Sequence, residues 1–206
     1  MPNIVYNRMV VEGNPDDIRV FKKRHFVGRT GHKEFDFDTV IPLGDSPQLN
    51  EVIYAWGTKW NSWDLEWVNR FEDRPAFGPG VDELDFRFKT AWAAPEPIFV
   101  TLMEMYPDLS FVIQSVDEFM EYGEKFVGYT DDKTNKAEYY KEAVTLVDPE
   151  FYEEVTGMKP SQEQLEMYEV ERKALEEEGD PTPWIVGGCL VGVAAASWYL
   201  NKARNK

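Results

Sequence analysis

The first 26 residues change from a strand-like to a helix-like pattern of apolar side chains. Residues 3–13 are rich in apolar and β-branched side chains and end at Gly13-Asn14-Pro15, which predicts a strand closed by a turn. Asn14 is then well placed to cap a helix, with Pro15 at its first position. Apolar side chains at helical spacing follow, and we expect this helix to run to about residue 26.

The tryptophan-rich segment that follows fits two periods at once. Its four tryptophans are Trp56, Trp60, Trp63 and Trp67. All four fall at helical spacing, but the last two also alternate with Leu65 and Phe71 at the spacing of a strand. We therefore predict a helix to about residue 60, a break over 61–62 and a strand over 63–71.

The middle of the chain carries segments with clearer patterns. Residues 84–92 alternate between apolar and charged side chains, so they predict a strand that forms an antiparallel hairpin with 63–71. Prolines open and close a helix over residues 95–105. Further strands are expected over 35–38, 109–116 and 118–130.

The order of these elements predicts the fold class. The series β-α-(α)-β-β-α-β-β is typical of an α+β domain with helices on one face of an antiparallel sheet. The character of the chain changes from about residue 135, and residues 147–180 hold 12 acidic and 3 basic side chains. The three predicted parts are an α+β domain over 1–134, an acidic helical stalk over 135–180, and a C-terminal anchor helix with a basic tail over 181–206.

Four short stretches follow one another in an order and spacing that match a known family. They are the opening MPN…YN…VVEG, then FDFDTVIPLG at 35–44, WGTKWN at 56–61 and TAWAAPEP at 90–97. In these stretches the chain resembles the YubB-type ferredoxin-like proteins of plasmids and bacteriophages, over roughly residues 1–130. The resemblance implies a ferredoxin-like α+β sandwich encoded by a mobile element. It implies no activity, and it does not extend to the acidic stalk or the C-terminus.

Composition narrows the possible partners. The net charge is −16, with 38 acidic against 22 basic residues, and no basic patch is evident, so direct binding to nucleic acid is disfavoured. A single cysteine, Cys189, excludes an intramolecular disulfide. The seven-residue spacing of His25 and His32 fits no standard ligand pattern, so we expect neither a metal nor another cofactor.

An uncharged run of 17 residues, 184–200, is the strongest signal near the C-terminus. As a helix it would be about 25 Å long, which is the lower limit for spanning a bilayer. The aromatic residues at its two ends, typical of membrane interfaces, are Trp184, Trp198 and Tyr199. The small residues that recur every four positions, typical of helix packing in lipid, are Gly188, Gly192 and Ala196.

These features predict a tail anchor in the bacterial inner membrane, with the domain facing the cytoplasm and with possible homo-oligomers through the small-residue face. The alternative is a soluble cytoplasmic protein whose apolar helix is buried in the fold or in an assembly.

The tryptophan-rich segment also supplies the candidate binding residues. An aromatic pocket with a lysine could hold an anionic ligand. The candidate ligand-binding residues are Trp56, Lys59, Trp60, Asn61 and Trp92. The competing interpretation is that the same tryptophans form the core of a small sandwich.

Three functions remain open. No nucleophile elbow, Walker lysine or dinucleotide motif is present, so we assign no catalytic residues. We predict a non-enzymatic accessory protein of a phage or plasmid, which binds a host or phage protein at the membrane. The alternatives are a soluble acidic inhibitor that mimics nucleic acid, and a small-ligand-binding domain or enzyme that uses the pocket near Lys59.

Overall fold

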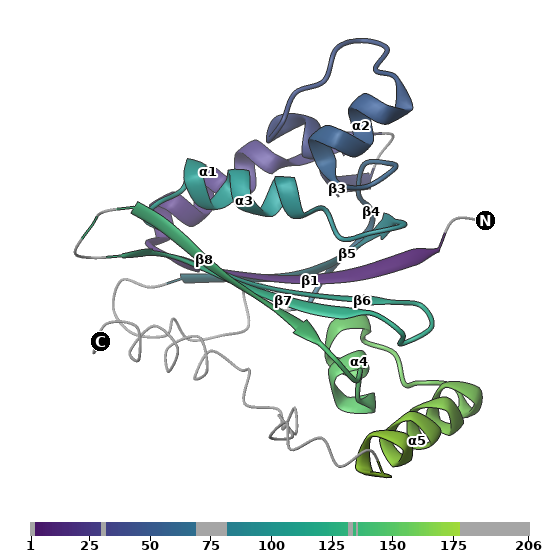
Figure 1. The fold of residues 1–206 in the computed structure, drawn as a ribbon. Helices are drawn as coiled ribbons and strands as arrows, with labels where there is room; N and C mark the ends of the chain where they lie inside the picture. The colour runs from purple at the N-terminus through teal and green to yellow at the C-terminus, as the bar shows by residue number, and fades with distance from the viewer. Residues whose placement is uncertain (1–2, 30–31, 69–81, 132–133, 135, 178–206) are drawn as a thin grey trace.

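A six-stranded antiparallel sheet organises the part of the chain that the computed structural model describes, namely residues 3–29, 32–68, 82–131, 134 and 136–177. Its order is β4-β5-β1-β6-β7-β8, and a separate hairpin pairs β2 with β3 (Figure 1). The strands are β1 (Ile4–Gly13), β2 (Phe26–Arg29), β3 (His32–Phe35), β4 (Trp63–Trp67), β5 (Asp82–Ala91), β6 (Ser110–Asp117), β7 (Gly123–Asp131) and β8 (Lys136–Val144). The helices are α1 (Pro15–His25), the 3-10 helix η1 (Phe37–Thr39), α2 (Leu49–Trp56), α3 (Glu96–Met105), α4 (Pro149–Thr156) and α5 (Gln162–Glu177).

The main core lies between the sheet and the pair of helices α1 and α3, which cover the same face (Figure 1). The alternating residues Val5, Met9 and Val11 of β1 point into it from the middle of the sheet. The fully buried phenylalanines of this face are Phe21, Phe35, Phe37, Phe86, Phe88, Phe99, Phe111 and Phe126. Burial of one such side chain stabilises the fold by about 1.5–3 kcal/mol, so this face dominates the stability.

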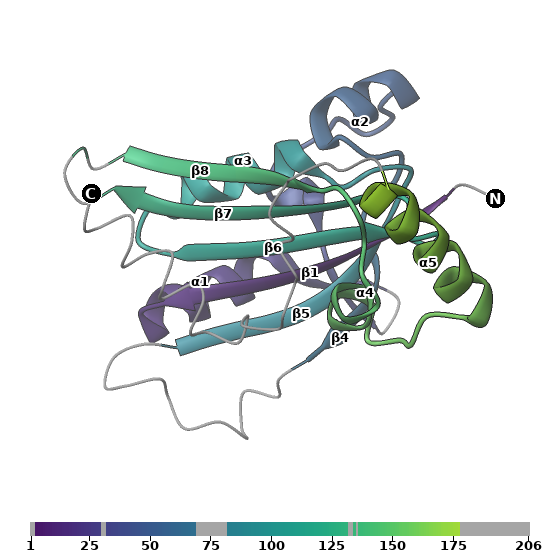
Figure 2. The ribbon, with the colours of Figure 1, turned by 60° about the horizontal axis from the view of Figure 1, so that its bottom comes forward.

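The opposite face of the sheet carries α4 over one end (Figure 2). Arg8 of β1 donates two hydrogen bonds to the Asp85 carboxylate, of 3.0 and 2.8 Å, and one of 2.6 Å to Glu154 of α4. A second, smaller apolar cluster holds α4 to the sheet: Val116, Met120, Val147, Phe151, Tyr152 and Val155. The alternation predicted for 84–92 is confirmed, although Asp85 is buried because Arg8 neutralises it.

The predicted first strand and first helix are confirmed. The Asn14 side chain accepts a hydrogen bond of 2.8 Å from the Asp16 backbone N–H, and Pro15 is the first residue of α1. The helix over 95–105 and the strand over 109–116 also form, as α3 and β6. Strands 63–67 and 82–91 pair antiparallel, as the hairpin prediction requires.

The helix expected to reach residue 60 ends four residues earlier, at Trp56. Gly57 takes the left-handed backbone conformation, with φ +76°, and its N–H donates to the Ile53 carbonyl at 2.9 Å. Glycine adopts this conformation without a steric penalty. The helix therefore ends here, although tryptophans at helical spacing continue beyond it. The following strand is also shorter than predicted, because β4 ends at Trp67.

Two further strand predictions are wrong in part. Within 35–38 only Phe35 is in a strand, because the Asp36 side chain accepts from the Asp38 backbone N–H and begins η1. The strand expected over 118–130 begins at Gly123 instead, after a turn in which Asp117 accepts a hydrogen bond of 2.9 Å from the Tyr122 backbone N–H.

The prediction of a helical stalk from residue 135 is wrong for residues 136–144, which form β8. This strand pairs with β7 along its whole length, at the edge of the sheet. An edge strand is paired on one side only, so it can form with little alternation of apolar and polar side chains. A strand with so weak a pattern is not predicted from the sequence. The later part of the predicted stalk is helical: α5 begins at Gln162, where Ser161 and Gln164 exchange side-chain-to-backbone hydrogen bonds.

Among the described residues, no helix is long and apolar enough to cross a membrane. The segment 184–200 lies outside the described residues, together with its predicted interface and packing residues. The anchor helix therefore stays a prediction.

Candidate functional site: the Lys59 cluster

The loop after α2 is fastened to the end of β5. The Thr58 hydroxyl donates to the Ala91 carbonyl at 2.7 Å and accepts from the Ala91 N–H at 3.1 Å, while the Lys59 N–H donates to the same carbonyl at 3.3 Å. Thr58 is buried. These bonds bring together two segments that are more than thirty residues apart and give the loop a defined backbone.

Trp92 follows β5 directly and adopts an unusual backbone conformation. Its φ is +78°, in the left-handed region, which costs a non-glycine residue about 1–2 kcal/mol. Its N–H donates to the Asn3 carbonyl at 2.9 Å, and 48% of the residue is exposed. The fold thus holds a large aromatic side chain on the surface against a local conformational cost, a combination that is common at binding sites.

Lys59 lies between two exposed indole rings. Its Nζ is 4.5 Å from the ring centroid of Trp92 and 5.0 Å from that of Trp60, and the Trp60 and Trp63 rings meet edge to face at 6.0 Å. We call Lys59, Trp60, Trp63 and Trp92 the Lys59 cluster. Each such cation–π contact stabilises an exposed lysine by about 0.5–1 kcal/mol.

Among the described residues, the partners of the Lys59 charge are ring faces. Within the described ranges, no ion pair to Lys59 is present. Its ammonium group can therefore form an ion pair with a group from outside the chain, while the rings exclude water from one side of that contact.

The other two predicted binding residues, Trp56 and Asn61, do not join this cluster. Trp56 is buried, and its Nε1 donates to the Ile41 carbonyl at 2.9 Å. Asn61 accepts from the Phe37 N–H at 2.9 Å and donates to the Asp36 carboxylate at 2.6 Å. Both side chains therefore point into the protein and stabilise the loop through these hydrogen bonds.

Trp63 belongs to the Lys59 cluster but was not among the predicted binding residues. Its spacing in the sequence indicates only the start of a strand.

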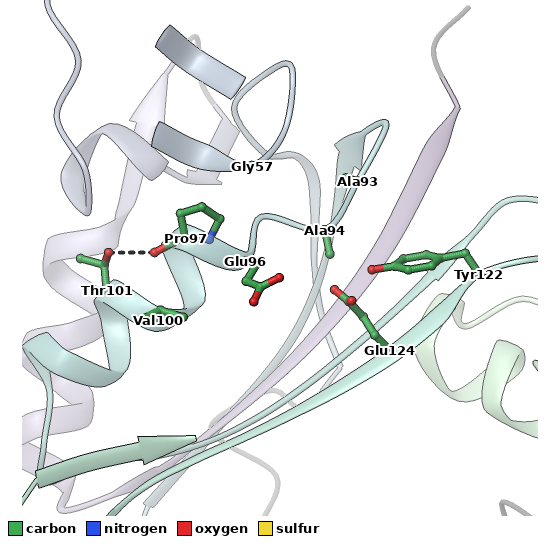
Figure 3. A pocket seen from close by; sticks show the side chains of 9 residues that line it. All are labelled: Gly57, Ala93, Ala94, Glu96, Pro97, Val100, Thr101, Tyr122 and Glu124. Atoms are coloured by element: carbon green, nitrogen blue, oxygen red, sulfur yellow. Dashed lines mark hydrogen bonds between the residues drawn. The ribbon is translucent and has the colours of Figure 1, made fainter. Parts of the chain in front are cut away.

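A second feature, which we call the acid cavity, opens between α2, α3 and the start of β7. Its volume is about 570 Å³, and Figure 3 shows the side chains of Glu96, Tyr122 and Glu124 around one space. Lys141 of β8 joins the two carboxylates, with its Nζ 2.6 Å from Glu96 Oε2 and 3.1 Å from Glu124 Oε2. Burial, together with the hydrogen bond and charge of Glu124, raises the pKa of the Tyr122 hydroxyl, so the phenol stays neutral. Glu96 lies on α3, Tyr122 and Glu124 lie just before and at the start of β7, and Lys141 lies on β8, so no single sequence motif connects the four residues.

His25 is a core residue. Its Nδ1 lies 2.6 Å from the Thr39 hydroxyl and its Nε2 lies 2.7 Å from the Tyr106 hydroxyl. Burial lowers the pKa of the His25 ring to about 4, helped by the nearby Arg24 charge, so the ring is neutral at pH 7. In the described part of the chain, no three histidine, cysteine or acidic side chains gather as metal ligands would.

Comparison with known proteins shows a similarity to a described family over part of the chain. A family model described as the ferredoxin-like domain in Api92-like protein matches residues 51–149. The chain has a ferredoxin-like α+β fold. The matched range holds α3 and five of the six strands of the sheet, from β4 to β8, together with Lys59 and the two carboxylates of the acid cavity. No curated protein and no solved structure matches the chain.

Proposed function

We propose that this chain is a non-enzymatic accessory protein of a phage or plasmid, and that it binds a protein partner through the Lys59 cluster. The observation that carries the proposal is a lysine between two half-exposed tryptophans on a fastened loop, with no ion pair to any residue that the structure describes. Tryptophan is enriched at the energetic centres of protein interfaces, because it buries a large rigid area and keeps a polar N–H. Two of the stretches that resemble YubB-type proteins, WGTKWN and TAWAAPEP, contain Lys59, Trp60 and Trp92.

The chemistry of the cluster specifies the partner surface. A carboxylate on the partner would pair with Lys59, and apolar side chains beside it would cover the indole rings. The chain as a whole carries a net charge of −16, so long-range attraction does not select an acidic partner. The contact has to be local and well fitted, with a carboxylate set in an apolar patch.

Site-specific crosslinking tests this function. A photo-crosslinking residue is placed at position 60 of the full chain and, in a separate protein, at position 54, since Tyr54 is 89% exposed and outside the cluster. The partner that crosslinks from position 60 is identified, purified and titrated against the native chain and against Trp92→Ala, Lys59→Gln and Tyr54→Ala. We expect Trp92→Ala to weaken binding at least tenfold and Lys59→Gln severalfold, with Tyr54→Ala unchanged. Equal crosslinking from both positions, or unchanged binding by Trp92→Ala, would refute the proposal.

The membrane location is a separate part of the proposal and needs its own test. It is supported by the uncharged segment 184–200 of the sequence. Leu190→Lys puts a charge at the centre of this segment, which costs about 2.5–3.5 kcal/mol in a bilayer, whereas Leu190→Ala keeps it uncharged. We expect native chain and Leu190→Ala to stay in carbonate-washed membranes and Leu190→Lys to leave them. Release of all three would favour the soluble alternative.

The acidic-inhibitor alternative stays a prediction that salt dependence distinguishes. A nucleic-acid mimic binds a basic protein through many carboxylates, so its affinity falls steeply with salt. Binding through the Lys59 cluster depends mainly on buried ring area. Its affinity should therefore change little between roughly 50 mM and roughly 300 mM salt.

A further inference from the structure

We propose that the acid cavity is a binding site for a primary alkylammonium group, and that Lys141 occupies the position of this group in the free protein. The site is distinct from the Lys59 cluster, and the inference does not rest on the protein-binding function.

The polar groups around the cavity select a cation. Glu124 is almost fully buried, with 3% of its side chain exposed, and Glu96 lies opposite it in the first turn of α3. The Tyr122 hydroxyl, hydrogen-bonded to Glu124, stays neutral because burial and the two glutamates raise its pKa. Two carboxylates and a neutral phenol give a negative field that repels phosphate or carboxylate ligands and attracts an ammonium group.

Lys141 shows where such a group binds. Its Nζ is within hydrogen-bond distance of both carboxylates, at 2.6 and 3.1 Å, and lies 4.9 Å from the centroid of the Phe126 ring. This is the arrangement that recognises an ammonium ion: two anionic acceptors and one aromatic face. In the free protein this cation is the ammonium group of Lys141, which belongs to the edge strand β8.

The position of Lys141 allows an external amine to displace it. The residue lies on β8, which is paired on one side only, and 38% of its side chain is exposed. Its flexible four-carbon stem can turn to solvent without moving the backbone. Glu124 is buried, so leaving its carboxylate without a partner cation is costly, and an amine that replaces Lys141 restores the pairing.

The walls of the cavity accept a short carbon chain. Apart from the two carboxylates, the lining is mostly small or apolar, and it comprises Gly57, Ala93, Ala94, Pro97, Val100, Thr101 and Tyr122 (Figure 3). The volume of about 570 Å³ lies in the range of small-ligand sites, roughly 300–1,000 Å³. An alkylamine of four to six carbons, free or as a lysine side chain of a peptide, matches this combination of an acidic end and apolar walls.

The decisive variant is Lys141→Met, which removes the internal cation and keeps the length and apolar character of the side chain. Pentylamine is titrated into the full chain, in phosphate buffer without competing amines, and binding is followed by calorimetry. We expect Lys141→Met to bind pentylamine at least tenfold more tightly than the native chain. Pentanol, the matched neutral probe, should bind neither protein. Equal affinity of the two proteins, or no binding to either at millimolar pentylamine, would overturn the proposal, because Lys141 would then be only a structural ion pair.

Two carboxylate variants complete the test. In the Lys141→Met background, Glu124→Gln should abolish pentylamine binding, and thermal melting checks that the double variant is folded. If it does not fold, Glu96→Gln provides the test at a more exposed position and should weaken binding severalfold. Undiminished binding by a folded variant of this kind would contradict the assignment. A blocked lysine, N-acetyl-lysine methylamide, distinguishes the sources: tighter binding than pentylamine indicates a peptide ligand, and weaker binding indicates a free amine.

Discussion

Lys59 and Lys141 are two lysines on aromatic rings whose surroundings give them opposite roles. Lys59 lies between Trp60 and Trp92, with Nζ distances of 5.0 and 4.5 Å to the ring centroids and no ion pair among the described residues. Lys141 lies over Phe126 and joins Glu96 and Glu124. A charge held by ring faces keeps its capacity to pair with an anion, whereas a charge between two carboxylates is already neutralised.

The difference follows from the elements that carry the two residues. Lys59 is on a loop whose backbone is fastened to Ala91, so its position is set without help from its side chain. Lys141 is on an edge strand, and its side chain ties β8 to α3 and β7. The first lysine is therefore available for an external partner, and the second satisfies a buried carboxylate inside the fold.

The largest expected effect comes from Gly57, which precedes the Lys59 loop and also lines the acid cavity. Its φ is +76°, and an added Cβ would lie 2.7 Å from Pro97 Cδ. Gly57→Ala should therefore destabilise the fold by about 2–3 kcal/mol, from the left-handed conformation and from the clash. Urea unfolding measures this change. Gly28→Ala, with open space around its Cβ, should stay within about 0.5 kcal/mol. Similar values for the two variants would mean that the two sites do not depend on this turn.

Burial also shifts the pKa values of two further groups, His25 and Glu12, in opposite directions. Burial lowers the pKa of His25 to about 4, whereas burial and the Glu83 charge raise the pKa of Glu12 to about 7. His25 stabilises the fold fully above its unfolded value of 6.5, and this stability is lost as the pH falls toward 4. Glu12 acts in the opposite sense: its contribution is present below its unfolded value of 4.5 and is lost as the pH rises through 7.

Between about pH 7.5 and about pH 5 the two groups act in opposite directions, so single variants separate them. Glu12→Gln should lose about 2 kcal/mol of unfolding free energy on acidification, because only the His25 effect remains. His25→Gln should be stabilised over the same range, by less than the Glu12 shift alone implies, because Glu12 is partly exposed and screened by solvent. Urea unfolding at the two pH values measures both slopes, and equal slopes in the two variants would refute the assignment.

The two lysines should also differ in their contributions to stability. Lys141→Met leaves Glu124 buried beside Glu96 without its cation and should cost about 1.5 kcal/mol. Lys59→Met loses only surface cation–π contacts and should cost about 0.5 kcal/mol. Thermal or urea unfolding of the two variants at pH 7 compares them directly. A larger loss for Lys59→Met would reverse the roles assigned to the two residues.

A further comparison concerns the backbone of Trp92. Its φ of +78° favours glycine, so Trp92→Gly should be more stable than Trp92→Ala by about 1 kcal/mol, although both lose the same ring. Urea unfolding of the pair isolates the backbone cost from the contacts. If alanine proved as stable as glycine, the surface position of Trp92 would carry no strain, and one support for the Lys59 cluster as a binding site would be lost.

Local sequence patterns predicted those parts of the fold in which the backbone conformation depends on a particular residue type. Asn14 and Pro15 marked the start of α1, and the alternation over 84–92 marked β5 and its buried face. Gly57 ended α2 before the predicted residue, because a left-handed glycine overrides a continuing helical period. The edge strand β8 was missed, since a strand that is paired on one side requires little apolar alternation.

The candidate site was predictable only where its residues are close in sequence. Lys59 and Trp60 are neighbours, and Trp92 lies in a second tryptophan-containing stretch, so a lysine–tryptophan pocket could be proposed from the chain. The inward orientation of Trp56 and Asn61 could not, because it depends on partners as distant as Ile41 and Asp36.

The sequence by itself thus determined the α+β class, the cap of α1, the alternating core strand and the acidic character of the molecule, because each depends on neighbouring residues or on composition. Only the tertiary structure decided which lysine is neutralised and which is available. Glu96, Tyr122, Glu124 and Lys141 meet because antiparallel pairing sets β8 beside β7 and the sheet places α3 over them. Such contacts depend on register and on the packing of distant elements, and no local pattern in the chain encodes them.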